Sequence, residues 1–384
     1  MTQMLGYQPP PTPGRKLAGV NWMVIALVAL IAAFGVASLY SVARGSFSPF
    51  AERHALRAML GIAVILGMAM VPLRFWLALA YPSYFVLLAA LALVPLVGTE
   101  AMGAKRWLRF AGLSVQPSEF MKVALVLALA RYYQWLDPAR VSRPVWVLAP
   151  CLMIAAPVML VLQQPDLGTA VLFAAVGVAL MFIAGVNPLY FLGTAGVGAA
   201  LAPLLWERLH AYQQQRIRVF LDPELDPLGS GYHVLQSKIA LGSGGLTGKG
   251  FLKGTQGQLN FLPEKETDFI FTMLGEEWGY IGAAALICLY AMLIVMLLAM
   301  AMSCRSAFAR QLNAGAALIV FVYASINISM VIGLVPVVGV PLPLVSYGGT
   351  AMTAIFAALG LAMCGYVNRN ERLRRDDVRG FLGT

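Results

Sequence analysis

The sequence predicts an all-α protein that crosses a membrane many times. Of its 384 residues 60% are hydrophobic and only 11% are charged, whereas a soluble domain carries about 25% charged residues. Apolar runs long enough for a bilayer-crossing helix, about 20 residues each, recur along the chain. These two observations indicate one transmembrane domain over residues 1–384 rather than a set of soluble domains.

We expect ten transmembrane helices, each corresponding to one apolar run. The eighth run is longer than one crossing requires, so we expect it to begin with a turn around Glu276–Gly279 and to cross from about Tyr280. The ten runs lie near 20–42, 56–72, 75–97, 117–134, 144–162, 168–186, 188–205, 268–300, 312–334 and 345–368. They leave tails at 1–19 and 369–384 and a large loop at 206–267 between the seventh and eighth helices.

The basic residues predict the orientation, because cytoplasmic loops carry an excess of Lys and Arg. With the N-terminus inside, the inner segments hold thirteen basic residues and the short outer loops hold six. Both termini are therefore expected in the cytoplasm. This topology also explains the net charge of +10, so we expect no nucleic-acid partner. The four cysteines form no CxxC pair, which argues against a disulfide framework and a zinc site.

Carboxylates crowd the segment 261–279, where a polar stretch enters an apolar one. Ionisable groups at the depth of a membrane span are costly unless they are paired or hydrated, and are functional candidates by default. Glu264 and Glu266 fit solvated charges at the headgroup level. Asp268 is the last carboxylate before Phe269 and the hydrocarbon, which makes it the candidate acid or base.

The outer loop 98–116 holds Lys105, Arg106 and Arg109. Three basic residues in a short outer loop run against the topological preference, so they either bind a negative ligand or anchor Trp107 at the headgroups. In the span that follows, Glu119 and Lys122 lie three residues apart on one helix face. They form a self-neutralising pair, face a cavity, or both.

Two further outer segments contain candidate residues. In 206–267, RIRVFL and GYHVLQSKIAL predict amphipathic helices on the outer leaflet. The run GSGGLTGKGFLKGTQG lacks the spacing of a nucleotide-binding loop; its Lys249 either holds a non-nucleotide phosphate or belongs to a mobile loop. Segment 335–350, with Ser346, is expected to be an ordered turn lining a cavity, because irregular backbone is excluded from contact with lipid. Asp166, before the sixth span, is expected to cap that helix.

Basic groups beside one carboxylate at a membrane edge suit a lipid-linked phosphate substrate. Arg and Lys would hold the pyrophosphate, and the carboxylate would take a proton from an attacking hydroxyl. The residues alone leave three classes open: an enzyme, a lipid flippase and a non-catalytic scaffold. The clustering of charges near the outer face favours the enzyme, since a transporter needs polar groups along its depth.

Four segments carry a resemblance to a known family: AKRWLRFAGLSVQPSEFMK, QQPDLGTA, GSGGLTGKGFLKGTQGQLNFLPEKETDFIFTMLGEEWGYIG and GLVPVVGVPLPLVSYGG. Together they resemble the SEDS family (shape, elongation, division, sporulation) over about residues 20–368, in its elongation form, the RodA type. The resemblance implies a peptidoglycan glycosyltransferase with ten transmembrane helices in the bacterial cytoplasmic (inner) membrane. It would polymerise lipid II into β-1,4 glycan strands for elongation, at a site facing the periplasm.

The resemblance also implies roles for single residues. Asp268 is expected to be the catalytic base, and Arg106, Glu119 and Lys122 are expected in or beside the substrate cavity. Lys105, Lys249 and Ser346 are added to the substrate site by local chemistry. Glu266 stands where many elongation members have His, and we expect its charge to raise the pKa of Asp268.

The partners that the family implies are lipid II, the growing glycan strand, membrane lipid, a class B penicillin-binding protein that acts as transpeptidase, and MreC, MreD and MreB. A divalent cation, Mg²⁺ or Mn²⁺, would neutralise substrate pyrophosphate; whether one is needed is left open. No all-protein metal cage is visible in the sequence.

Overall fold

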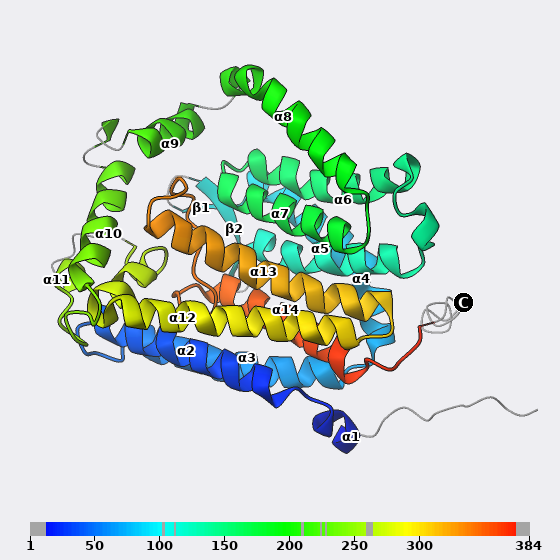
Figure 1. Cartoon of the computed structure of the whole chain (residues 1–384), viewed down its shortest axis with the longest axis horizontal. Helices are drawn as coiled ribbons and strands as arrows, with labels where there is room; N and C mark the ends of the chain where they lie inside the picture. Colours follow the sequence, from blue (N-terminus) through cyan, green and yellow to red (C-terminus); the bar gives the residue numbers. More distant parts are fainter. Residues whose placement is uncertain are drawn as a thin grey trace, which may run out of the picture.

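The computed structural model describes residues 13–101, 104–110, 113–208, 211–222, 225–226, 229–258 and 264–373. It is a bundle of long helices with one small sheet (Figure 1). The helices are α1 Pro13–Ala18, α2 Trp22–Val42, α3 Phe50–Met70, α4 Leu73–Val97, α5 Pro117–Gln134, η1 Pro138–Arg140, α6 Pro144–Leu162, α7 Leu167–Ile183, α8 Pro188–Arg208, α9 Ala211–Leu221, α10 Ser230–Gly244, α11 Thr255–Gln258, α12 Ile270–Ser303, α13 Ala307–Val331 and α14 Gly349–Val367.

The predicted spans correspond to long apolar helices. Within the described residues, seven helices are long and apolar enough to cross a membrane: α2, α3, α4, α6, α12, α13 and α14. Two shorter apolar helices, Leu167–Ile183 and Pro188–Leu204, coincide with the sixth and seventh predicted spans. Helix α5 has 18 residues but carries Glu119, Lys122 and Arg131, so its composition alone does not mark it as a span. The protein is therefore a multi-pass membrane protein.

Helix α13 forms the centre of the bundle and packs against α5, α7, α12 and α14. Small residues allow these close contacts, as is usual between helices in a membrane. A side chain at Gly315 of α13 would collide with Val126 of α5, and one at Gly61 of α3 would collide with Phe356 of α14. By contrast, α8 extends away from the bundle (Figure 1), and its described apolar side chains are mostly exposed.

Helix α12 is broken where the sequence predicts a turn. Gly279 adopts φ 66° and ψ −163° inside the helix, a backbone region that glycine tolerates best. The glycine-rich loop fits against this break, because Tyr280 N donates to Gly245 O (2.9 Å) and Ile281 N donates to Leu246 O (3.1 Å). The break separates a short first segment, 270–278, from the long crossing helix and confirms the expected division of the eighth run.

The loop after α4 is a three-stranded antiparallel sheet, which the sequence analysis treated as plain loop. Strands β1 Thr99–Ala101, β2 Ala104–Phe110 and β3 Leu113–Val115 pair in the order β1-β2-β3. In the large loop, by contrast, the two predicted amphipathic helices are present as α9 and α10.

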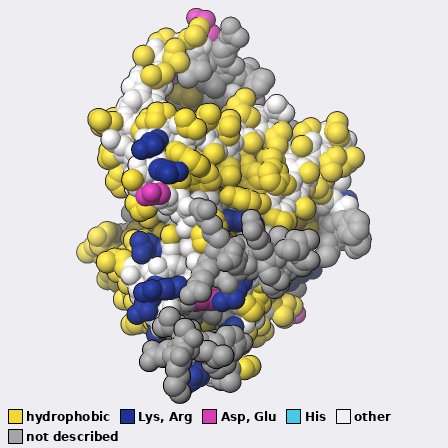
Figure 2. Space-filling model, turned by 90° about the vertical axis from the view of Figure 1, so that its right-hand side faces the viewer, with side chains coloured by type: hydrophobic (Ala, Val, Ile, Leu, Met, Phe, Trp, Pro, Cys, Tyr) yellow, Lys and Arg dark blue, Asp and Glu magenta, His cyan; other side chains and the backbone are white. Residues whose placement is uncertain are grey.

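Several exposed arginines lie at one end of the bundle, while Arg44, Arg53, Arg109 and Arg218 are exposed elsewhere. The arginines at this one end lie at helix ends and in short connections: Arg15, Arg140, Arg143, Arg305, Arg310 and Arg372. Figure 2 faces this end and shows basic side chains spread over it. We call it the arginine-rich end. The sheet, α9–α11 and the segment 332–348 lie at the opposite end (Figure 1), which we call the loop end.

Candidate functional site

Asp268 lies at the loop end in a turn just before α12. The backbone amides of Thr267 and Asp268 both donate to Glu264 O at 3.1 Å. Buried Asn327 of α13 donates its Nδ2 to Asp268 O (2.9 Å) and to Val340 O (2.7 Å). One amide group therefore fixes the backbone of Asp268 and the segment that faces it.

The carboxylate of Asp268 faces the backbone of Gly339. A Cβ at Gly339 would lie 3.4 Å from Asp268 Oδ2, and Gly339 has φ 71°. Among the described residues, the Asp268 side chain forms no hydrogen bond or ion pair; the hydrogen bonds of this residue are made by its backbone amide and its backbone oxygen. The carboxylate is half-buried and has acceptor capacity left for a ligand.

This environment changes the acidity of Asp268. Burial raises the pKa of Asp268 to about 7, and the carboxylates of Glu264 and Asp166 contribute in the same direction, while Arg216 opposes them. The sequence pointed to Glu266 as the neighbour that raises this pKa, but the contributing carboxylates are Glu264 and Asp166. A carboxylate with a pKa near 7 suits general base catalysis near neutral pH.

Ser346 joins the 332–348 segment to the Asp268 turn. Its buried hydroxyl donates to Thr267 O (2.5 Å) and accepts from Leu342 N (2.7 Å). Next to it, Tyr347 N donates to Glu266 O (2.8 Å). The hydroxyl that we expected at the substrate is thus engaged by the backbone, and Ser346 is placed to position Asp268 rather than to contact a ligand.

Arg106 and Lys105 are neighbours on β2 but have different surroundings. Arg106 donates to Pro165 O (2.6 Å), and its Nε lies 3.7 Å from Asp166 Oδ2. Asp166 caps α7 as expected, since it accepts from Thr169 N (3.1 Å). Lys105 is exposed. Arg106 thus lies beside Asp166, a carboxylate that raises the pKa of Asp268. Lys105 forms no hydrogen bond or salt bridge with these residues in the described part of the chain.

Glu119 and Lys122 form a closed cluster with Tyr323 inside the bundle. Lys122 Nζ donates to Glu119 Oε1 (2.7 Å) and to the hydroxyl of Tyr323, which donates to Glu119 Oε2 (2.6 Å). Lys122 also lies over the Tyr323 ring, 4.5 Å from its centroid. All three side chains are buried. The self-neutralising pair is therefore present, and Tyr323 is a third member that the sequence analysis missed.

Lys249 lies in another cluster, in which Asp268 takes no part. Its Nζ donates to Glu276 Oε1 (2.7 Å) and to Thr255 Oγ1 (2.8 Å), and the backbone amide of Gln256 also donates to Glu276 Oε1 (3.0 Å). The expectation that Lys249 is free to hold a phosphate is therefore revised. A buried carboxylate takes the ammonium instead, and the glycine-rich loop serves to lock the first segment of α12.

The structure also bears on whether the protein itself could hold a metal ion. Among the residues that the structure describes, no group of three or more His, Cys, Asp or Glu is placed to hold a metal ion. Asp268, Arg106 and the buried Glu119–Lys122–Tyr323 cluster are the ionisable groups that make up the candidate site at or near the loop end.

Asn327 is a residue of the site that the sequence analysis missed. An amide in an apolar span is a signal that could have suggested it, but the sequence does not show its two carbonyl partners, Asp268 O and Val340 O.

The comparison with protein families decides the family. The family model FtsW/RodA/SpoVE, described as cell cycle protein, matches residues 16–371. The chain belongs to this family. Among its members, the peptidoglycan glycosyltransferase MrdB of Escherichia coli K12 is 42% identical over 350 residues, covering 90% of this chain and 93% of MrdB. A probable peptidoglycan glycosyltransferase FtsW of Trichlorobacter lovleyi is 34% identical over 91% of this chain and 93% of that protein.

Solved structures of family members share the fold. A chain from a peptidoglycan synthase complex, described as coordinating polymerization and crosslinking, superposes with a TM-score of 0.80 at 34% identity, over 92% of this chain and 99% of that chain. The rod shape determining protein RodA of Thermus thermophilus superposes with a TM-score of 0.69 at 29% identity, over 92% of this chain and 98% of RodA. The SEDS resemblance and the RodA-like fold are thereby confirmed.

Proposed function

We propose that this chain is a peptidoglycan glycosyltransferase that polymerises lipid II into β-1,4 glycan strands for cell elongation. The observation that carries the proposal is the carboxylate of Asp268, which has a pKa of about 7 and, among the described residues, no side-chain partner. Relatives named as peptidoglycan glycosyltransferases cover nearly the whole chain. An under-satisfied carboxylate at a fixed position is what a general base requires.

In the proposed reaction Asp268 accepts the proton of the acceptor sugar hydroxyl. The hydroxyl oxygen forms the new bond to the anomeric carbon of the donor, and the bond from that carbon to the pyrophosphate oxygen breaks. Undecaprenyl pyrophosphate leaves with the bonding electron pair, and the configuration inverts from α to β. Arg106 lies beside Asp166 and Pro165, where it can stabilise negative charge near this site.

The proposed topology places the loop end in the periplasm and the arginine-rich end in the cytoplasm of the inner membrane. Ten spans result when α5, α7 and α8 are added to the seven apolar helices. The exposed arginines of the arginine-rich end agree with this orientation, because cytoplasmic segments are enriched in Lys and Arg. Residues 1–12 and 374–384 of the two predicted cytoplasmic tails lie outside the described residues.

The proposed principal partner is a transpeptidase of the class B penicillin-binding protein type. The similar chain in a complex described as coordinating polymerization and crosslinking supports this partner. MreC, MreD and MreB are proposed on family membership alone.

A polymerisation assay with the purified full-length chain tests the function. Fluorescent lipid II in detergent should give a ladder of glycan strands, because detergent micelles have no two sides between which a flippase could move lipid. Absence of a ladder, combined with transfer of lipid II across vesicle membranes, would favour the flippase. Absence of both activities, with transpeptidase binding intact, would favour the scaffold.

A further inference from the structure

Four prolines lie inside the membrane helices α4 and α6, and each leaves one backbone carbonyl without its usual donor. Pro82 and Pro95 interrupt α4, and Pro150 and Pro157 interrupt α6. Proline has no N–H, so the carbonyl four residues earlier loses its helical hydrogen bond. Within a bilayer no water replaces that bond, and an unsatisfied carbonyl is costly. The carbonyls concerned are those of Ala78, Leu91, Trp146 and Met153.

A polar side chain from another segment donates to each of these four carbonyls. The four bonds run from Arg131 Nη1 to Ala78 O (3.1 Å), from Gln164 Nε2 to Leu91 O (2.8 Å), from the Tyr132 hydroxyl to Trp146 O (2.7 Å) and from the Tyr84 hydroxyl to Met153 O (2.9 Å). The match at every internal proline of α4 and α6 identifies these side chains as replacement donors. Together they join α4, α5 and α6, which pack against one another (Figure 1).

Gln164 is the replacement donor that also lies beside the candidate site. It is buried and belongs to the short connection between α6 and α7, two residues before Asp166. Arg106 donates from Nε to Gln164 O (3.4 Å) and from Nη2 to Pro165 O (2.6 Å). In the described part of the chain, none of the other three donors bonds to Arg106, Asp166 or Asp268. Gln164 therefore bonds to α4 through its side chain and to Arg106 through its backbone.

The side chain of Gln164 ties the connection to the helix that leads into the Arg106 strand. Leu91 lies near the loop end of α4, and β2, which carries Arg106, packs against the same helix. The backbone of the connection is held on α6 by Gln164 N, which donates to Val161 O (2.9 Å). The side-chain bond to Leu91 O adds a tie to a second helix. Without it, the two carbonyls that hold Arg106 would keep their link to α6 and lose the one to α4.

We propose that Gln164 is a positioning residue, which donates to the carbonyl that Pro95 frees and thereby holds Arg106 in its working orientation. The inference rests on the proposed function, because Gln164 acts through an arginine that stabilises negative charge in that reaction. A guanidinium whose direction is fixed before the substrate arrives needs no reorganisation in the transition state. Misplacement of such a group by about 1 Å can cost about a hundredfold in rate.

Melting temperatures and rates of lipid II polymerisation, measured on the full-length protein in detergent, separate positioning from a merely structural role. Gln164→Leu removes the donor, so the melting temperature should fall, and kcat should fall at least about tenfold with little change in KM. Pro95→Ala returns an N–H to Leu91 O. The variant Pro95→Ala/Gln164→Leu should therefore melt like Pro95→Ala, while its kcat stays at least about tenfold below that of Pro95→Ala. Recovery of both quantities would mean that Gln164 only satisfies the carbonyl, and would overturn the proposal.

Two further comparisons complete the test. Tyr84→Phe, the matched control, removes the donor to Met153 O and should lower the melting temperature without changing kcat. Arg106→Gln/Gln164→Leu should turn over at the same rate as Arg106→Gln, because residues that act through one group are not additive. A further loss in the double variant as large as that of Gln164→Leu alone would contradict action through Arg106.

The outcomes distinguish a failure of this proposal from a failure of the proposed function. A wild-type chain that forms no glycan ladder counts against the function, and the melting temperatures, which need no turnover, then test the bond to Leu91 O by themselves. If Gln164→Leu does not fold, Pro95→Ala/Gln164→Leu is compared with Pro95→Ala alone. Wild-type kcat in folded Gln164→Leu, or a melting temperature equal to that of the wild type, would overturn the proposal.

Discussion

Asp268 and Glu276 lie eight residues apart on one segment, yet their surroundings are opposite. Glu276 is buried, and its Oε1 accepts bonds from Lys249 Nζ, Thr255 Oγ1 and Gln256 N. The carboxylate of half-buried Asp268 has no such donor among the described residues, while its backbone oxygen is held by Asn327. The chain thus fixes the position of Asp268 through its backbone and leaves its side chain unsatisfied.

This difference separates a structural carboxylate from a functional one. A buried carboxylate that is paired and hydrogen-bonded holds two segments together. A carboxylate that is partly desolvated without a partner costs stability, and such a cost is typical of functional sites. Substitution at the two positions should therefore have opposite effects on stability.

The largest effect on stability is expected for Glu276→Ala. Removing it leaves Lys249 without its carboxylate and Gln256 N without an acceptor, so the free energy of unfolding should fall by about 2–3 kcal/mol, below the usual 3–5 for a fully buried pair because Lys249 is 27% exposed. Thermal unfolding in detergent measures the change. Lys253→Ala, an exposed residue of the same loop, is the control and should leave the melting temperature unchanged. Equal stability of the two variants would mean that the Lys249–Glu276 contact does not lock α12.

The next effect is on activity and concerns the buried Glu119–Lys122–Tyr323 cluster. Lys122→Ala should lower the rate of lipid II polymerisation at least about tenfold, or about 1.4 kcal/mol, because it leaves Glu119 buried without its ammonium partner. Initial rates from glycan ladders measure it. Tyr323→Phe keeps the ion pair and the ring, so its loss should be smaller. Wild-type turnover of Lys122→Ala would return Lys122 to a purely structural role.

A smaller effect, of opposite sign to that of Glu276→Ala, is expected for the stability of Asp268→Asn. The folded pKa of Asp268, about 7, lies above its ordinary value of 3.8, so the folded state binds the proton more tightly and this group makes stability fall as pH rises from about 4 to 7. Asn carries no charge and so avoids the cost of burying an ionised carboxylate. The melting temperature of the Asp268→Asn variant should exceed that of the wild type by a few degrees at pH 8, and the difference should close near pH 4. A lower melting temperature than the wild type at pH 8 would show that the carboxylate is stabilising.

The smallest effect is a shift in the pH dependence of activity. A general base acts when deprotonated, so kcat/KM should rise with pH around a midpoint near 7, the pKa of Asp268. Glu264→Gln removes a carboxylate that raises this pKa, and the midpoint should move to lower pH. Glu266→Gln is the matched control, since Glu266 does not contribute. A midpoint that moves in Glu266→Gln but not in Glu264→Gln would show that Glu266 raises the pKa of Asp268, as the sequence suggested.

The sequence predicts those features that depend on local patterns. Apolar runs gave the spans, the surplus length of the eighth run gave the break at Gly279, and RIRVFL and GYHVLQSKIAL gave α9 and α10. The N-cap role of Asp166 also follows from its position before a helix. Each of these is determined by residues close together in the chain.

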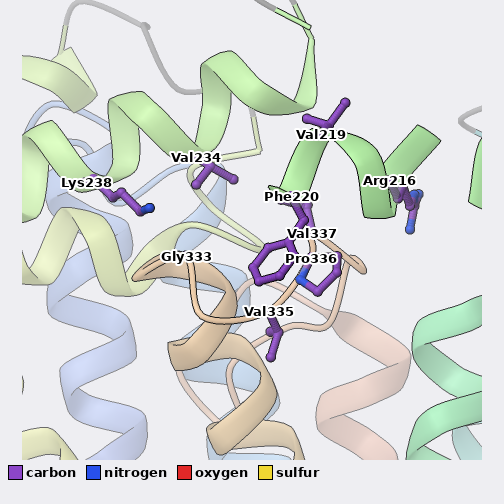
Figure 3. A pocket seen from close by; sticks show the side chains of 9 residues that line it. All are labelled: Arg216, Val219, Phe220, Val234, Lys238, Gly333, Val335, Pro336 and Val337. Carbon is purple, nitrogen blue, oxygen red and sulfur yellow. The ribbon is translucent and has the colours of Figure 1, made fainter. Parts of the chain in front are cut away.

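The remaining features depend on contacts between distant segments. Lys249 and Glu276 are separated by 27 residues, and Ser346 and Thr267 by 79, so their pairing is not visible in a linear reading. Lys122 and Tyr323 are 201 residues apart. For the same reason Arg216 and Lys238 appeared only as parts of two separate amphipathic helices, although the fold brings both to the lining of one pocket (Figure 3).

The most direct test of the central claim is the initial rate of lipid II polymerisation by Asp268→Asn at pH 8, measured on protein whose melting temperature shows that it is folded. The account predicts no glycan ladder from a protein at least as stable as the wild type. A ladder formed at the wild-type rate by this folded variant would contradict the account, because the unsatisfied carboxylate would then have no part in activating the acceptor hydroxyl.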